Sequence, residues 1–230
     1  MDNNKKIARI AGLFYFMFIL TSVIANMFGK FVFEEARVTV NQILAHESLF
    51  RTGFLISLIS YVLFLLAAWY LYVLLEPVGK KLAVLFLLLN LAGFAISVLD
   101  HLNLFASVLI LGGADYLKAF QSVQLQSQAT LFVDLFKYGS TIAQIPYGVW
   151  LFPLGYLVYK SGFLPKILGI LLIADCFALM IYVCQRFLFP GYDVISYPCW
   201  AVSFLAEFGF SLWLLIMGTK KQEPIAVEVG

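Results

Sequence analysis

The chain has 230 residues, of which 63% are hydrophobic and only 12% are charged, and its formal net charge is +2. A soluble domain carries about 25% charged residues, so this composition excludes an ordinary water-soluble protein. The lysines and arginines are scattered along the chain and form no basic patch. We therefore expect no nucleic acid among the partners.

Six apolar segments fill most of the chain, and each is long enough to cross a bilayer, whose hydrocarbon core takes about 20 apolar residues to span. They are Ile10 to Phe28, Gly53 to Leu75, Leu82 to Leu111, Ala129 to Tyr159, Ile167 to Phe189 and Ser196 to Met217. The sequence predicts an all-α, polytopic membrane helix bundle with about six transmembrane helices. We expect residues 1–218 to form one transmembrane domain and residues 219–230 to form a short polar cytoplasmic tail.

The first segment is longer than the apolar region of a signal peptide, and no clear cleavage site follows it, so we expect it to be retained. The basic residues predict the direction of crossing. If the N-terminus is cytoplasmic, the cytoplasmic side holds Lys5, Lys6, Arg9, Lys80, Lys81, Lys160, Lys166, Lys220 and Lys221, and the opposite side holds Lys30, Arg37, Arg51, Lys118 and Arg186. Because basic residues concentrate on the cytoplasmic side, we expect both termini to lie in the cytoplasm. We expect the protein itself to lie in the inner (plasma) membrane.

Glycine and proline residues interrupt the predicted helices. Gly112 and Gly113 end the third helix. Pro146 and Pro153 fall inside the fourth segment, where each frees a backbone carbonyl and favours a kink. In the last two segments, Cys184 and Cys199 flank one loop. They can form a disulfide or remain free as small apolar residues.

Small and polar residues recur at helical spacing in every segment, which is how a bundle turns one side of each helix inward. This pattern predicts a hydrated cavity. Ser97 and Thr141 lie on the polar stripes of the third and fourth segments, whereas Leu99 and Phe136 lie off them.

Six polar residues are the candidates for the cavity and its ligand. They are Asp100, His101, Asn103, Asp134, Lys137 and Glu207. A rise of about 1.5 Å per residue places the ionisable residues of the third and fourth segments in the outer half of the bundle, so we expect the cavity to face outward. Glu207 and Asp175 lie nearer the middle, where they would form the floor. A charged group inside the membrane is costly enough to favour a functional role.

Charge pairing is the alternative role for these residues. Lys137 can neutralise Asp134, three residues away on the same face, or reach Asp100 across the bundle. Our expectation is that Asp134 and Lys137 behave as a pair and that Asp100 and His101 are ligand residues. Glu207 has no nearby cation in the sequence, so we expect it to be neutral and hydrogen-bonded, or to be a proton or ligand site.

No catalytic or metal-binding signature accompanies these residues. His46 and His101 are the only histidines, and neither belongs to an HExxH motif. The GxSxG motif of serine hydrolases is also absent. His101 could act as a base oriented by Asp100 or Asp134, although adjacent residues on a helix point about 100° apart. We expect no metal and no cofactor.

Several stretches carry a resemblance to a known family. They are ARIAGL at 8–13, ESLFR at 47–51, GGADYL at 112–117, LGYLVYKSGFLPKILGILL at 154–172 and FPGY at 189–192. In these stretches the chain resembles the bacterial membrane family catalogued as domain of unknown function 4386. The resemblance covers nearly the whole chain and implies an integral membrane protein of bacterial type. It implies no activity and no catalytic residues.

The sequence as a whole favours a membrane protein that binds or transports a small molecule or lipid through an outward-facing polar cavity. Two alternatives stay open: a membrane-embedded enzyme that uses Asp100, His101, Asp134 and Lys137, and a non-catalytic membrane assembly subunit. The expected partners are the lipid bilayer and a small-molecule or lipid ligand. Six helices are few for a carrier acting alone, which favours a homodimer or a role other than transport.

Overall fold

The computed structural model describes residues 3–33, 47–112 and 115–220, and all the regular elements in these ranges are helical. The longer helices are α1 (Asn3–Phe33), α3 (Glu47–Leu111), α4 (Ser122–Val149), α5 (Leu151–Lys160) and α6 (Lys166–Leu188). The chain ends with α7 (Ser196–Ser203), the π-helical η3 (Phe204–Phe208) and α8 (Gly209–Ile216), while short 3₁₀ turns form η1 (Asp115–Leu117) and η2 (Asp193–Ile195).

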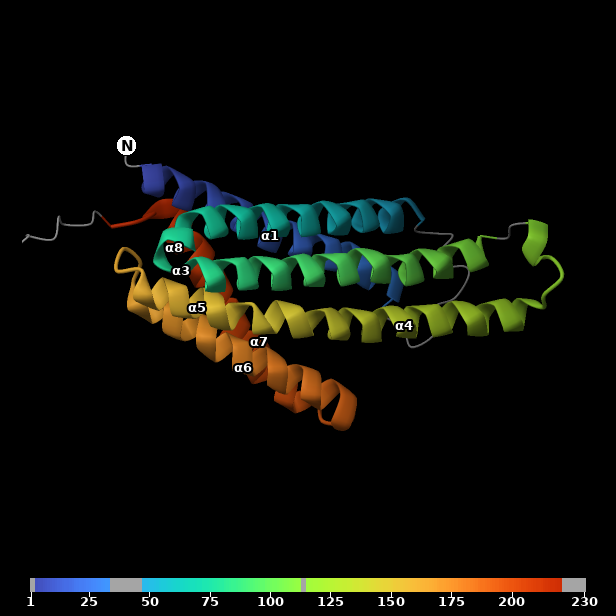
Figure 1. Cartoon of the computed structure of the whole chain (residues 1–230). Helices are drawn as coiled ribbons and strands as arrows, with labels where there is room; N and C mark the ends of the chain where they lie inside the picture. Colours follow the sequence, from blue (N-terminus) through green and yellow to red (C-terminus); the bar gives the residue numbers. More distant parts are fainter. Residues whose placement is uncertain (1–2, 34–46, 113–114, 221–230) are drawn as a thin grey trace, which may run out of the picture.

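Helix α3 is a hairpin of two membrane-crossing halves. Its 65 residues are interrupted at Gly79, whose φ of −174° and ψ of 87° are not helical. Figure 1 shows the two halves side by side and running in opposite directions. Five described segments are long and apolar enough to cross a membrane, and α3 crosses twice. The predicted all-α bundle with about six crossings is confirmed, and the chain is a multi-pass membrane protein.

The predicted interruptions also fall close to the expected residues. Helix α3 ends at Leu111, next to Gly112. Helix α4 ends at Val149 and α5 begins at Leu151, so the break between Pro146 and Pro153 falls at Trp150. Cys184 and Cys199 are both free, so the disulfide alternative is not realised. The predicted polar tail lies largely outside the described residues, which end at Lys220.

Helices α5 and α6 pack closely through two glycines. A Cβ atom added at Gly155 would lie 2.7 Å from the carbonyl oxygen of Gly169, and one added at Gly169 would lie 2.7 Å from the backbone nitrogen of Tyr159. The two helix backbones are therefore in direct contact, which only glycine allows. Elsewhere in the core, the buried ring of Tyr15 packs against those of Phe64 and other aromatic residues.

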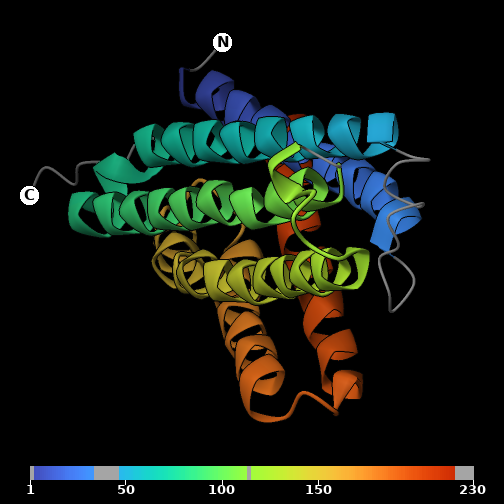
Figure 2. The same ribbon diagram turned by 90° about the vertical axis from the view of Figure 1, so that its right-hand side faces the viewer.

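The α6–α7 hairpin leans away from the other helices. Figure 2 shows it running at a steep angle to α3 and α4, with its connecting turn far from theirs. In Figure 1 the α3–α4 hairpin extends beyond the loop-side end of α6. The helices are thus packed closely near the chain termini and diverge toward the opposite end, which we call the loop end.

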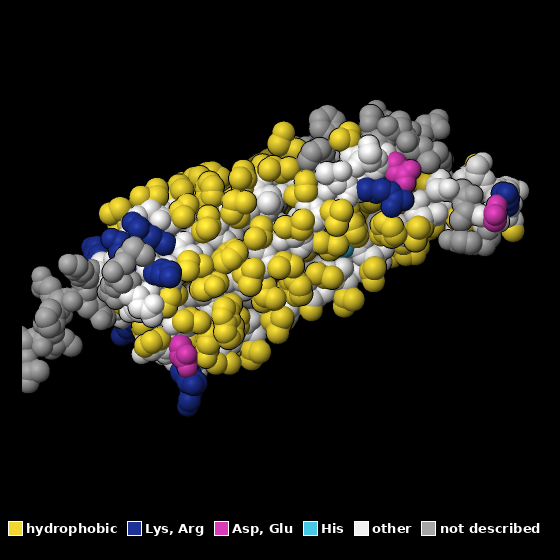
Figure 3. All heavy atoms as spheres, turned by 90° about the horizontal axis from the view of Figure 1, so that it is seen from above, with side chains coloured by type: hydrophobic (Ala, Val, Ile, Leu, Met, Phe, Trp, Pro, Cys, Tyr) yellow, Lys and Arg dark blue, Asp and Glu magenta, His cyan; other side chains and the backbone are white. Residues whose placement is uncertain are grey.

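The two ends of the bundle differ in charge. The start of α1 and the end of α8 lie at one end (Figure 1), and Figure 3 shows apolar side chains covering the surface between the charged ends. Four ion pairs lie toward the loop end: Arg51–Glu47, Lys118–Asp115, Lys137–Asp134 and Arg186–Asp193. At the terminal end, Lys80 pairs with Glu76, and Lys81, Lys160 and Lys166 add positive charge. This excess agrees with the predicted cytoplasmic placement of the termini.

Candidate functional site

A cavity lies between α1, α3, α4, α6 and α7 and consists of two adjoining chambers. The chamber nearer the loop end, the outer chamber, has a volume of about 460 Å³. The inner chamber has a volume of about 540 Å³. The residues that line both are Ser22, Asn26, Tyr61, Ser140, Gln144 and Trp200. The two chambers therefore lie side by side and share part of their wall.

The wall of the outer chamber combines apolar side chains with polar and basic ones. His101, Lys137 and Arg186 are its ionisable lining residues apart from Tyr61 and Tyr182, and no carboxylate is among the described residues that line it. Hydroxyl and amide side chains complete the polar wall, namely those of Ser22, Asn26, Ser57, Ser60, Ser140, Thr141 and Gln144. This wall offers hydrogen-bond donors and positive charge to whatever enters it.

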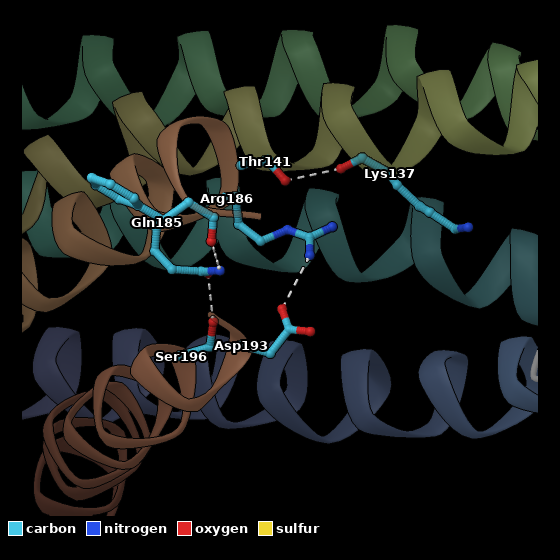
Figure 4. Close-up of polar contacts among 7 residues, drawn as sticks. Lys137, Thr141, Gln185, Arg186, Asp193 and Ser196 are labelled. Carbon is cyan, nitrogen blue, oxygen red and sulfur yellow. Dashed lines mark hydrogen bonds and ion pairs between the residues drawn. The ribbon is translucent and has the colours of Figure 1, made fainter. Parts of the chain in front are cut away.

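Helices α4 and α6 carry the two permanent cations of this chamber (Figure 4). The Thr141 hydroxyl donates to the Lys137 carbonyl over 2.9 Å, one turn along α4. Arg186 Nη1 lies 3.6 Å from Asp193 Oδ1 across the turn between α6 and α7. Beside it, the Ser196 hydroxyl donates to Gln185 Oε1 over 2.8 Å. The Arg186 and Gln185 contacts join the loop end of α6 to the turn and to α7.

His101 lies in a cage of aromatic rings. Its side chain is 3% exposed, and its ring centroid lies 5.5 Å from that of Phe54, 5.2 Å from that of Tyr61 and 5.1 Å from that of Phe136. Its Nδ1 lies 3.0 Å from the carbonyl oxygen of Ser97. Because a carbonyl can only accept, Nδ1 carries a proton, and Nε2 is left for a second partner.

Asp100 is buried and its carboxylate is bonded on both oxygens. Asn103 Nδ2 donates to Oδ1 over 3.2 Å, and the Ser140 hydroxyl of α4 donates to Oδ2 over 3.0 Å. A Cβ atom added at Gly139 would overlap this carboxylate. Asp100 and Asn103 are not among the residues that line either chamber. The geometry makes Asp100 a link between α3 and α4, and its role toward a ligand stays a prediction.

Asp134 and Lys137 form the pair expected from their spacing. Lys137 Nζ lies 3.0 Å from Asp134 Oδ1, and both side chains are about half exposed, at 55% and 51%. Lys137 lines the outer chamber, whereas Asp134 is not among its lining residues. The alternative pairing of Lys137 with Asp100 is not the one in the structure, since Asp100 bonds to Asn103 and Ser140.

The inner chamber is mainly aromatic and ends at a carboxyl group. Its apolar lining includes Phe18, Phe64, Trp150, Leu179, Phe204 and Phe208. Glu207 also lines it, from the π-helical segment η3, and accepts a 2.7 Å hydrogen bond from the Tyr15 hydroxyl. Asp175 lies close enough to interact electrostatically with Glu207. That these two carboxyls form the floor of a ligand cavity stays a prediction.

Sequence reasoning missed the aromatic character of the cavity. Phe136, which it placed off the polar stripe, lines the outer chamber, whereas Leu99 is 64% exposed on the outside of the bundle as expected. The error has a physical cause. An aromatic residue in an apolar helix gives the same signal whether it faces lipid or a cavity, so polarity alone cannot identify it.

The described residues contain no group of three or more His, Cys, Asp and Glu side chains placed to hold a metal ion. His101 bonds to Ser97 and Asp134 bonds to Lys137, so no hydrogen bond joins His101 to Asp134 among the described residues. The structure therefore offers no assembled base and orienter among the four residues considered for catalysis.

Comparisons with known proteins give a family but no activity. The family described as "Domain of unknown function (DUF4386)" matches residues 10–218. An uncharacterized protein of Archaeoglobus fulgidus is 38% identical over 85 residues, which are 37% of this chain and 49% of that protein. The chain therefore matches about half the length of this relative. No solved structure matches the chain.

Proposed function

Because the chain belongs to the DUF4386 family, whose description assigns no activity, we propose its function from the cavity: it binds a small amphipathic molecule or lipid with an anionic head group. The head group would occupy the outer chamber and the apolar part the inner chamber. Exchange with the loop side would make the protein a carrier or a receptor for such a molecule in the membrane.

The contrast between the two chambers carries the proposal. The outer chamber presents Lys137, Arg186 and His101 with no carboxylate among its described lining residues, whereas the inner chamber is lined mainly by aromatic and aliphatic side chains. An anionic head group suits the first because cations and hydrogen-bond donors bind it, and arginine can do so through two parallel bonds. An acyl or aromatic body suits the second because burial removes its apolar surface from water.

The size of the cavity agrees with such a ligand. Each chamber falls within the roughly 300 to 1,000 Å³ of typical small-molecule sites, which are mostly apolar with a few placed polar groups. The acids that neutralise Lys137 and Arg186 are Asp134 and Asp193, and neither lines the chamber. Both cations can therefore turn toward an anion while their partners remain in place at the loop end.

Two amphiphiles of equal chain length and opposite head charge test the proposal. Dodecanoate, added to the purified protein in nanodiscs below its micelle-forming concentration, should raise the thermal unfolding temperature, and dodecyltrimethylammonium should not. A protein is stabilised by what binds its folded form. Arg186→Met should remove most of the stabilisation by dodecanoate.

Lys118→Met is the matched control, because Lys118 forms a loop-end ion pair with Asp115 and lines neither chamber. It should leave the dodecanoate effect unchanged. Equal stabilisation by both amphiphiles, or a dodecanoate effect that survives in Arg186→Met, would reject an anion-selective cavity. Mass spectrometry of co-purified lipids and small molecules would then identify the natural ligand without prior assumption.

A further inference from the structure

Asp175 is a fully buried carboxyl group with an unused oxygen. It stands on α6 with no exposed surface, and its Oδ1 accepts a hydrogen bond from the Ser203 hydroxyl of α7. Its Oδ2 is also buried and has no hydrogen-bond partner among the described residues. A buried carboxylate oxygen without a partner is costly, and each such group requires a physical explanation.

Glu207 brings a second carboxyl group to the same place. It lies one turn beyond Ser203, within the π-helical turn of the last membrane segment. Its side chain lines the inner chamber, as does that of Ser203. π-Helical turns are rare and occur often at functional sites. Water or a ligand in the chamber can therefore reach Glu207 directly, and Asp175 lies behind Ser203.

We propose that Asp175 and Glu207 form a proton-binding carboxyl pair at the floor of the inner chamber. The cost of two neighbouring negative charges in a membrane interior is high, and no lysine, arginine or histidine is among the described residues that line this chamber. Among the described residues, the titratable groups that interact with the pair are Tyr15 of α1, Cys176 of α6 and Cys199 of α7, and none is a cation. The pair therefore retains at least one proton.

The proton is exchanged with water in the chamber. Binding forms an O–H bond on a carboxylate oxygen and removes one negative charge, and release returns the proton to a water molecule. Tyr15 donates to Glu207 Oε2, and this leaves Oε1 available for the proton. The Ser203 hydroxyl lies between the chamber and Asp175, and it can reorient to pass a hydrogen bond between them.

A metal cation fits this floor less well than a proton. A calcium ion takes six to eight oxygen ligands, whereas here two carboxyls and two hydroxyls lie beside aromatic rings. The site goes beyond the proposed ligand binding and does not depend on it. If both hold, a deprotonated floor would repel an anionic ligand, so occupancy of the cavity would vary with pH.

Infrared spectroscopy of the full chain in lipid tests the proposal directly. At neutral pH the unmodified protein should show the C=O stretching band of a protonated carboxylic acid. The band should lose intensity in Glu207→Gln or in Asp175→Asn, both of which keep the side-chain shape. Glu47→Gln is the control, because Glu47 is an exposed partner of Arg51 and should contribute no such band.

Tyr15→Phe keeps both carboxyls, so it tests the proposal even if the Glu207 and Asp175 variants fail to fold. It should shift the frequency of the band without removing it, because Glu207 loses its hydrogen-bond donor. Absence of the band from the unmodified protein would overturn the proposal. So would a band that stays unchanged in all three floor variants, or one that disappears when sodium replaces choline in the buffer, since a metal cation would then occupy the site.

Discussion

Asp100 and Asp175 are both buried aspartates on membrane-crossing helices, and they differ in how many of their carboxylate oxygens accept a hydrogen bond. Asp100 has hydrogen bonds on both oxygens, from Asn103 and from Ser140. Asp175 has one bonded oxygen and one without a partner among the described residues. Burial alone therefore does not separate a structural carboxyl from a functional one. The unused hydrogen-bonding capacity does, because it is what a proton or ligand can take up.

We expect the largest loss of stability when an added side chain displaces the Asp100 carboxylate, which joins α3 to α4. Gly139→Val places a side chain where the Asp100 carboxylate lies, so both Asp100 hydrogen bonds must shift. Overpacking of this kind costs about 3 kcal/mol. The measurement is thermal unfolding in detergent. Gly209→Val is the control, because a Cβ atom there meets nothing within 4 Å, and a similar loss in both variants would mean that the Gly139 contact is unimportant.

A matched pair of alanine variants tests the comparison itself. Asp100→Ala leaves the Ser140 hydroxyl and the Asn103 amide without their acceptor, which should cost about 1 to 3 kcal/mol. Asp175→Ala also removes a carboxyl oxygen that has no partner, and this gain offsets part of the loss. Its effect should be less than about 1 kcal/mol. Equal losses in unfolding free energy would show that Asp175 is as well satisfied as Asp100.

Sequence patterns alone predict the helical fold and the region of the chain that lines the cavity. Length and hydropathy predict the crossings, and Gly112, Pro146 and Pro153 predict where helices are interrupted, because these signals are local. Helical spacing also places Ser97 and Thr141 toward the cavity, and both line it.

Hydrogen-bond partners between helices could not be predicted in this way. Ser140 is one residue among many small polar ones, and nothing local shows that it faces Asp100. Tyr15 and Glu207 are 192 residues apart, and their contact depends on how α1 packs against the last crossing segment. The exposure of the Asp134–Lys137 pair likewise depends on how the other helices pack around α4, which no local pattern shows.

Thiol labelling sharpens the boundary of the cavity. In a background without the native cysteines, Thr141→Cys and Ser97→Cys should react with a polar thiol reagent added from outside the cell, because both positions line the cavity. Leu99→Cys and Leu135→Cys should react much more slowly, since these side chains face the lipid. Leu135 replaces Phe136 as the control on α4, because Phe136 lines the outer chamber. Equal labelling at all four positions would show that these positions do not line a hydrated cavity. Labelling only from the cytoplasmic side would show that the predicted orientation is wrong.

The smallest expected effect concerns Lys137 and separates its two roles. A buried ion pair that loses one partner costs about 3 to 5 kcal/mol, whereas an exposed pair contributes about 0 to 1 kcal/mol. With both side chains about half exposed, the Lys137–Asp134 pair belongs to the second class. Lys137→Met should therefore change the unfolding free energy by less than about 1 kcal/mol. Its stabilisation by dodecanoate should nevertheless fall, because Lys137 lines the outer chamber and Asp134 does not. If the single variant instead lost several kcal/mol and Asp134→Leu restored the loss, the pair would be structural and Arg186 would remain as the permanent cation for a head group.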